Sequence, residues 1–592
     1  MEEHNTAIPF RAYAALLGDY LRPQKWHATL LAALLLGTIG LQLANPLVVG
    51  YFLDMAQARS SLDRLFGAAL LFMGLAILRE LIYLVATYLG ENVAWTATNA
   101  LRADLALHCL RLDMSFHKRY KPGELIERVD GDVNQLANFF SSLVVQFAGN
   151  LLLVAGVLAV LWWQDWRLGL GITCAAAAGL AVLGRLSSRT VPRWHAVREA
   201  EARLFGAVEE WLNGTEEIRS SGAVPYIMVR LFQALRERFR AIVSAWRLQA
   251  WLFVIPIGVF ALAYIAAHMV GYVAFRAGGM TVGQVYVVFY YIAILQEPLW
   301  EIQHQVEDLQ RATASINRIG ELRALTPALH DGPGAPFGRG PLAVAFEKVT
   351  FRYEDDPNTS ILEDINFALK PGRVLGLLGR TGSGKSTLTR LLFRFYDPSE
   401  GAIRLGGNGA APADIRQATQ AELRRAIGMV TQEVHLFHAT VRQNLTLFDD
   451  SVPDERIRRV VADVGLADWL SSLPQGLDTP LEGSSGLSAG EAQLLAFARV
   501  FLADPGLVIL DEASSRLDPA TEQRVERAVA RLLEGRTGII IAHRLATVQR
   551  ADEIMILQDG RIAEHGPRAA LAADPASGFF RLLQTGLEEV MA

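Results

Sequence analysis

The most informative stretch of the sequence is Val374-Leu-Gly-Leu-Leu-Gly379-Arg-Thr-Gly-Ser-Gly-Lys385-Ser386. Its first part is an uninterrupted apolar run, which is typical of a strand buried on both faces of a parallel sheet. The following residues match the pattern G-x-x-x-x-G-K-[ST], in which backbone N–H groups turn toward phosphate oxygens at the start of a helix. The stretch therefore predicts a strand, a phosphate-binding loop and a helix, in that order.

This loop offers ligands to a nucleoside triphosphate and its magnesium ion. We expect Lys385 to bridge the β- and γ-phosphates and the Ser386 hydroxyl to bind Mg²⁺. The residues predicted to contact the nucleotide here are Gly379, Arg380, Thr381, Gly382, Ser383, Gly384, Lys385, Ser386 and Thr387. The predicted cofactors are therefore ATP and Mg²⁺.

Two later apolar runs end in side chains suited to phosphate chemistry. Leu507–Leu510 is followed by Asp511, which can hold Mg²⁺, and by Glu512, which can polarise an attacking water. Gly538–Ala542 is followed by His543, at the end of a strand where a side chain would reach the same γ-phosphate. The predicted catalytic residues are Glu512, His543 and Lys385.

Composition divides the 592 residues into two unlike parts. Apolar residues make up 51% of the chain, yet 20% are charged, and the mean hydropathy is +0.24. A net charge of −5 gives no sign of a nucleic-acid partner, and two cysteines cannot form a disulfide scaffold. We predict an α-helical transmembrane domain over 1–325, a Pro- and Gly-rich linker over 326–341, and an α/β P-loop NTPase domain over 342–592.

Five long runs without formal charge and a sixth run with two charged residues predict six transmembrane helices, since a span needs about 20 apolar residues. These runs are Ala28–Leu53, Leu65–Gly90, Val133–Gln164, Leu168–Gly184, Leu248–Phe275 and Ala277–Gln296. Arg79 and Glu80 interrupt the second run, either as a polar contact for cargo or as a structural ion pair with another helix. Because neighbours on a helix point about 100° apart, we do not expect the two to serve one ligand together.

Charge distribution orients these spans. Six Lys and Arg residues lie in 92–132 and eleven in 185–247, against four in the alternate loops. This asymmetry places the two long segments in the cytoplasm, as helices that continue past the membrane, together with both chain termini. Compact loops favour a bacterial inner membrane, with membrane lipid around the spans.

Further motifs make 342–592 resemble the nucleotide-binding domain of ABC transporters, and they stand in that family's order. Tyr353 resembles the aromatic residue that stacks on adenine, and Gln432 the glutamine that senses Mg²⁺. Leu487-Ser-Ala-Gly-Glu491 resembles the family signature, whose Ser488 and Gly490 would contact phosphate, and Asp518 belongs to a loop that crosses the dimer interface. The membrane part resembles the six-span exporters, with Phe116-His-Lys-Arg-Tyr-Lys-Pro-Gly-Glu124 as their first intracellular loop.

This resemblance implies a half-size exporter of the multidrug or lipid-flippase type. Such chains pair, because each ATP site combines the phosphate loop of one chain with the signature of the other. The signature here departs from Leu-Ser-Gly-Gly-Gln at Ala489 and Glu491, whereas the catalytic residues are intact. We therefore favour a heterodimer with a second half-transporter, with a homodimer as the alternative. The expected cargo is hydrophobic or amphipathic (a small molecule, lipid or peptide), and the alternative function is an ATP-binding regulatory or gating subunit.

Overall fold

A computed structural model describes residues 18–141, 148–335, 337–408, 411–482, 487–511, 519–542 and 548–585. The chain forms two compact units. The helical unit comprises Met1–Leu110 and Pro122–Leu325, and the α/β unit comprises Arg111–Lys121 and Thr326–Ala592. A short stretch between two helices of the first unit thus belongs by its contacts to the second.

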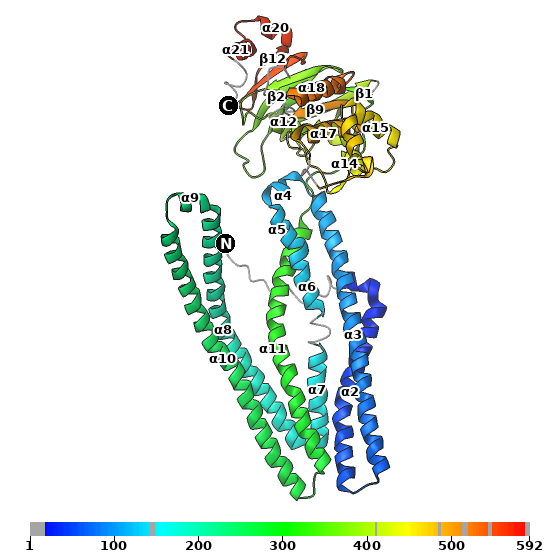
Figure 1. Ribbon diagram of the computed structural model, residues 1–592, viewed down its shortest axis with the longest axis vertical. Helices are drawn as coiled ribbons and strands as arrows, with labels where there is room; N and C mark the ends of the chain where they lie inside the picture. Colours follow the sequence, from blue (N-terminus) through cyan, green and yellow to red (C-terminus); the bar gives the residue numbers. More distant parts are fainter. Residues whose placement is uncertain are drawn as a thin grey trace. The chain divides into compact units, whose positions relative to one another are not determined.

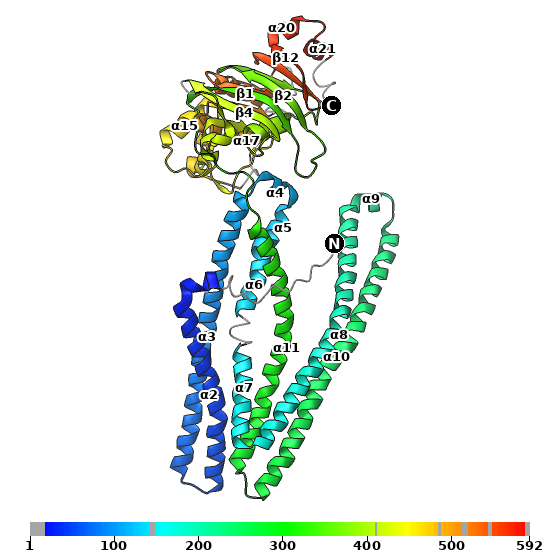
Figure 2. The ribbon, with the colours of Figure 1, turned by 180° about the vertical axis from the view of Figure 1, so that it is seen from behind.

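The helical unit consists of long helices joined by short turns. Its helices are α2 (Lys25–Gln57), α3 (Leu62–Arg111), α5 (Pro122–Ile126), α6 (Asp132–Ser141), α7 (Ala148–Gln164), α8 (Trp166–Asn213), α9 (Thr215–Ser220), α10 (Val224–Arg276) and α11 (Val282–Ala324), with the turns η1 (Arg22–Gln24) and η2 (Glu127–Gly131). Helices α8 and α10 run side by side and are joined by α9 (Figures 1 and 2). Helix α11 packs against α2, α7 and α10.

Four of the predicted spans are confirmed by length and composition within the described residues. They lie in the helices Gly18–Gln57, Leu62–Arg111, Trp166–Asn213 and Val224–Arg276. The third predicted span falls on α6 and α7 and on residues 142–147, which lie outside the described residues, and the sixth falls on α11. Helices α3, α8 and α10 have 50, 48 and 53 residues, far more than a bilayer requires, so the predicted extensions beyond the membrane exist.

The start of α11 differs from the prediction, which placed a span from Ala277. Gly278 has a φ of 74°, which a helix does not accommodate, and the chain turns there. Thr281 then caps the new helix by accepting a hydrogen bond from the Gln284 N–H, while the Gln284 side chain accepts one from the Thr281 N–H. The apolar run therefore includes a turn and a capping box before α11 begins.

Of the two alternatives for Arg79 and Glu80, an ion pair with another helix was wrong. Their side chains bond to each other rather than to another helix, with Arg79 Nε donating to Glu80 Oε1 at 3.1 Å. The two Cβ atoms point in different directions, but both side chains are long enough to bend together. Adjacent charges thus neutralise each other within one turn of α3.

Helices α2 and α11 approach each other closely at a pair of glycines. A Cβ atom on Gly283 would overlap the carbonyl oxygen of Gly50. At the same place Asp54 accepts hydrogen bonds from the Gly283 N–H at 2.7 Å and from the Thr281 hydroxyl at 2.8 Å. Small residues let the two backbones meet, as is usual for helices packed in membranes.

We expect Gly283→Ala to lower the thermal stability of the detergent-solubilised protein, at a cost of about 1–3 kcal/mol for overpacking. Gly320→Ala is the matched control, because it lies in the same helix and its Cβ would have no neighbour within 4 Å. That control should be neutral or slightly stabilising, since alanine favours a helix over glycine. Equal melting temperatures for the two variants would contradict the close contact.

The α/β unit contains a six-stranded sheet and a smaller antiparallel one. The six-stranded sheet has the order β12 (Arg561–Pro567), β11 (Glu553–Gln558), β3 (Val374–Leu378), β10 (Thr537–Ile541), β9 (Leu507–Asp511) and β6 (Ile427–Val430). The antiparallel sheet has the order β2 (Leu362–Leu369), β1 (Arg339–Phe351), β4 (Glu400–Asn408) and β5 (Ala413–Asp414), and β7 (Ala439–Thr440) pairs with β8 (Pro480–Leu481). The three predicted buried strands are confirmed as β3, β9 and β10, and all neighbours in the larger sheet except β12 are parallel.

Helices cover the larger sheet on one face, and the smaller sheet with α12 covers the other. The helices and turns of this unit are α4 (Met114–Arg119), α12 (Lys385–Leu392), α13 (Gln420–Ala426), α14 (Val441–Thr446), α15 (Asp454–Asp463), α16 (Ala467–Ser472), α17 (Ala489–Ala503), α18 (Pro519–Leu533), α20 (Arg568–Ala573), α21 (Gly578–Thr585), η4 (Ile415–Gln417) and η5 (Gly476–Asp478). Val508 and Leu510 join the core beneath α14, α15, α17 and α18, whereas Leu507 and Ile509 join the core with α12 and β1. Both faces are buried, which explains why β9 is apolar at successive positions.

Candidate functional site: a phosphate loop at a sheet edge

Three parallel strands of the larger sheet have their carboxyl ends at the same edge. Leu377 of β3 pairs with Ile541 of β10, and Ile541 pairs with Asp511 of β9. The phosphate loop begins just beyond β3, so it emerges at the edge of the sheet where Asp511 stands. Ligands of parallel α/β sheets bind at this carboxyl edge. The structure thus brings Asp511 and the predicted loop to one edge.

The loop is shaped by glycines at positions where a side chain would be strained or would clash. Gly379 has a φ of 149°, and a Cβ atom there would overlap the carbonyl oxygen of Leu557. Gly384 has a φ of 102° at the start of α12, and its Cβ would lie 2.6 Å from a methyl group of Leu362. Bare backbone therefore surrounds the position that the motif assigns to phosphate.

Two polar side chains inside the loop could donate hydrogen bonds to an anion. The Lys385 side chain is 6% exposed, and its ammonium donates hydrogen bonds to the carbonyls of Gly379 and Arg380, the latter at 2.9 Å. The Ser383 hydroxyl is buried and has no hydrogen-bond partner among the described atoms. Leaving a buried hydroxyl unsatisfied is costly, so this loop is built to receive an acceptor such as a phosphate oxygen.

Residues that could hold Mg²⁺ lie at the same edge. Ser386 is exposed at the first turn of α12, Asp511 ends β9, and the exposed Gln432 follows β6, the strand paired with β9. A hydroxyl, an amide carbonyl and a carboxylate are the oxygen ligands that Mg²⁺ prefers, so the donor set fits this ion. When bound, Mg²⁺ would neutralise charge on the β- and γ-phosphates. Glu512, Asp518 and His543 lie outside the described residues.

Tyr353 makes several contacts beside the loop. Its hydroxyl lies 3.2 Å from the Oγ1 of Thr387 and accepts a hydrogen bond from Arg390 at 3.3 Å. Its ring meets Phe351 and Tyr396 edge-on, at centroid distances of 4.8 and 5.2 Å. The predicted base-stacking residue is therefore linked by hydrogen bonds to the phosphate-loop helix α12.

Lys118 of α4 lies over the same tyrosine, and the sequence offered no signal for it. Its ammonium lies 4.5 Å from the centre of the Tyr353 ring and donates to Asp355 at 2.7 Å. These residues, together with Ser115, Arg119, Glu354 and Tyr396, line a cavity of about 170 Å³. The hydrogen bond raises the pKa of Lys118 and lowers that of Asp355, so this pair stays charged near neutral pH.

The signature segment forms the start of α17, and Glu491 has a clear structural role there. Ser488 caps the helix by accepting from the Glu491 N–H at 3.2 Å, and the Glu491 carboxylate accepts from the Ser488 N–H at 2.8 Å and from its hydroxyl at 2.9 Å. This is a capping box, which glutamine at the same position can also form. The carboxylate differs in placing a negative charge at the helix end that would otherwise attract an anion.

Arg499 is a second residue that the sequence did not reveal. From the last third of α17 it donates to the Asn444 carbonyl at 2.7 Å and to the His435 carbonyl at 2.8 Å. Asn444 in turn accepts from the Phe437 N–H at 2.8 Å. Burial lowers the pKa of Arg499. The signature helix is thus anchored to the segment that follows Gln432.

Comparison with known proteins agrees with this geometry. The model of the ABC transporter transmembrane region matches residues 29–299, and that of the ABC transporter family matches residues 362–515. A Streptococcus pneumoniae protein named as the ABC transporter ATP-binding protein exp8 is 31% identical over 566 residues, which cover 94% of each chain. The chain belongs to the ABC transporter family. The predicted family resemblance and fold class are confirmed.

Other relatives resemble this ABC transporter over nearly its full length. An ATP-dependent lipid A-core flippase of Cupriavidus metallidurans is 31% identical and aligns with 93% of this chain and 92% of its own. The structure of a bacterial Atm1-family ABC exporter with ATP bound superposes with a TM-score of 0.75 at 25% identity, covering 95% of this chain and 98% of the other. The transporter is an integral multi-pass membrane protein that fuses one ABC membrane domain to one ABC ATPase domain, in which ATP hydrolysis drives export.

Proposed function

We propose that this half-size transporter exports a hydrophobic or amphipathic cargo across a membrane, with Glu512 as the base in ATP hydrolysis. One observation carries the proposal: the glycine-shaped loop with its buried, unsatisfied Ser383 hydroxyl belongs to the same chain as the membrane-crossing helices. The names of two relatives agree with this function in kind, since one is a flippase and another an exporter.

Different residues of this chain bind the nucleotide, bind Mg²⁺ and activate the attacking water. Tyr353 stacks on the base, while the loop amides, Ser383 and Lys385 hold the phosphates. Ser386, Gln432 and Asp511 hold Mg²⁺, Glu512 takes a proton from the attacking water, and His543 contacts the γ-phosphate. ATP binds the closed domains more tightly than the open ones, and this difference supplies the work of transport.

We infer that the working unit contains a second half-transporter. Ser488 and Gly490 lie at the start of α17 and would contribute to a phosphate held by another chain, as Asp518 would to the interface between chains. The Glu491 carboxylate at this helix end weakens the attraction for phosphate, whereas the phosphate loop is complete. A partner with an unaltered signature would compensate, which supports a heterodimer over a homodimer.

The charge distribution supports a cytoplasmic location for both termini, and the compact loops favour a bacterial inner membrane. Relatives named lipid A-core flippases make a lipid one candidate cargo, beside small molecules and peptides. If the cargo is a lipid, the bilayer lipid that surrounds the helices is also the source of the cargo.

Reconstitution into liposomes tests the proposal. A fluorescent lipid or a lipophilic dye should move against its gradient only when ATP and Mg²⁺ are supplied on the side of the ATPase domain. If ATP permitted only downhill movement, the chain would be a gating subunit and the proposal would be wrong.

Restoring the family signature should raise the activity of the chain on its own. We expect Ala489→Gly with Glu491→Gln to increase the ATPase rate of the purified lone chain about tenfold or more, because the added methyl and the carboxylate no longer oppose phosphate. The measurement is phosphate release at saturating ATP. Glu482→Gln, outside the helix, is the control, and high turnover by the unaltered lone chain would refute the heterodimer.

A further inference from the structure

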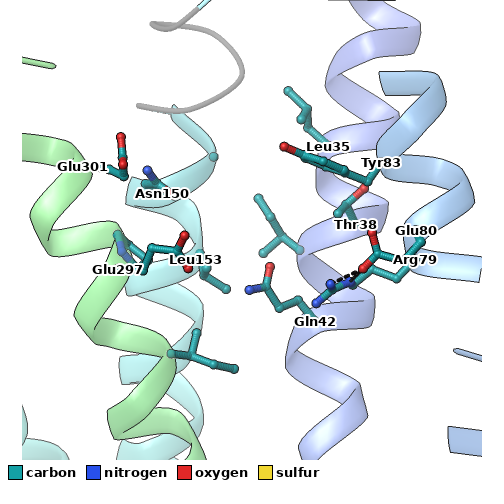
Figure 3. Close-up of a pocket in the computed structure, with 14 residues that line it drawn as sticks. Leu35, Thr38, Gln42, Arg79, Glu80, Tyr83, Asn150, Leu153, Glu297 and Glu301 are labelled. Atoms are coloured by element: carbon teal, nitrogen blue, oxygen red, sulfur yellow. Dashed lines mark hydrogen bonds and ion pairs between the residues drawn. The ribbon is translucent and has the colours of Figure 1, made fainter. Parts of the chain in front are cut away.

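A polar cavity lies among the helices of the membrane domain. It has a volume of about 440 Å³ and is lined by α2, α3, α7 and α11 (Figure 3). This volume is in the range of sites that hold a drug-sized molecule. The α2 and α3 side chains form one wall, and those of α7 and α11 form the opposite wall.

The two walls carry different charge. On one wall Arg79 and Glu80 are paired with each other, so their formal charges cancel. On the other, Glu297 and Glu301 stand one helical turn apart on α11 and both line the cavity. Within the described part of the chain neither carboxylate has a hydrogen bond or an ion pair. Three glutamates against one arginine leave the lining with two formal negative charges.

Neutral groups around these carboxylates add further acceptors. The side chains of Gln42 and Asn150 point into the cavity from opposite walls. Pro298 has no N–H to offer the carbonyl of Ile294 one turn earlier, and both residues line the cavity. Leu35, Ile39 and Leu153 supply apolar surface between the polar groups.

Carboxylates among membrane helices are costly unless a positive charge lies close by. In this cavity the arginine is already neutralised by its neighbour, and Glu297 and Glu301 are exposed to the cavity space, so a bound cation could supply the compensating charge. A cation with an apolar body meets both needs, because its charge pairs with α11 while its body covers the apolar lining. An anionic headgroup would face repulsion at the same place.

We propose that Glu297 and Glu301 form a cation-binding subsite that makes this cavity select amphipathic cations as cargo. The inference rests on the proposed export function, which it narrows to a class of substrate. In this proposal Arg79 and Glu80 form a part of the cavity lining without net charge and do not bind the cation.

Two ions of nearly equal size and opposite charge test the selectivity. Binding of tetraphenylphosphonium and of tetraphenylborate to the full-length protein is measured by equilibrium dialysis, with protein-free micelles subtracted. The double variant Glu297→Gln, Glu301→Gln should bind the cation at least tenfold more weakly than the unaltered protein and the anion no more weakly. Glu216→Gln on α9, outside the cavity, is the matched control and should change neither affinity.

An unchanged affinity for the cation in the double variant would overturn the inference. An equal loss of affinity for the cation and the anion would overturn it as well. Thermal melting of each variant shows whether the fold is kept, and single substitutions replace the double one if it is not. Uptake into proteoliposomes separates the two proposals. If cation binding depends on the glutamates but ATP drives no uptake, the cation-binding subsite is supported and the export function is refuted. If ATP drives uptake of a neutral dye and cations are not preferred, the export function is supported and the subsite is refuted.

Discussion

Lys385→Ala is expected to weaken ATP binding by about 10- to 100-fold, which is the loss of a charge-assisted hydrogen bond to phosphate. The ammonium group lies inside the loop, held by the carbonyls of Gly379 and Arg380, and nothing else in the loop carries a buried positive charge among the described residues. Equilibrium binding of a fluorescent ATP analogue to the full-length protein measures the effect directly.

Lys370→Ala is the control for this substitution, because Lys370 is exposed and lies outside the loop. A melting curve of each variant shows whether the two freed carbonyls disturb the fold. If a folded Lys385→Ala protein bound the nucleotide with unaltered affinity, Lys385 would not be a phosphate ligand.

Glu512→Gln should lower ATP turnover by about 100-fold or more while ATP binding is kept, because a positioned general base contributes about 10²–10⁴ to the rate. Glutamine has the same shape as glutamate but cannot accept a proton from water. The residue directly follows Asp511, the last residue of β9, at the edge where the phosphate loop begins. Phosphate release and nucleotide binding, measured on the same preparation, separate the two effects.

Glu534→Gln serves as the comparison, since this exposed glutamate lies between α18 and the start of β10, whose first residue pairs with Leu507 at the opposite end of β9 from Asp511. It should retain full turnover. If Glu512→Gln also turned over ATP at the unaltered rate, another group would have to be the base, and His543 would be examined next.

Local patterns in the sequence predicted much of the fold and the phosphate loop. The apolar strand and the glycines at 379 and 384 act over a few residues, so their conformation is largely set by their neighbours in the chain. The long helices follow likewise from uninterrupted apolar runs. The start of α11 was missed because Gly278 and Thr281 are uncharged and hid a turn inside such a run.

Contacts between distant parts of the chain could not be predicted in this way. Lys118 and Asp355 are separated by 237 positions, and neither has a neighbour in sequence that indicates the other. The ion pair between Asp132 and Arg318 joins α6 to α11 across 186 positions. For Arg79 and Glu80 one expectation from the sequence was an ion pair with another helix, whereas the two long side chains reach each other.

The membership of Arg111–Lys121 in the α/β unit has a practical consequence. A soluble fragment made from residues 326–592 would lack α4, and with it the lysine that lies over Tyr353 and pairs with Asp355. Nucleotide affinities measured on such a fragment would describe the proposed base-binding face without the Lys118 side chain that lies over Tyr353. Quantitative work on this enzyme therefore calls for the intact polypeptide, even when only its soluble part is of interest.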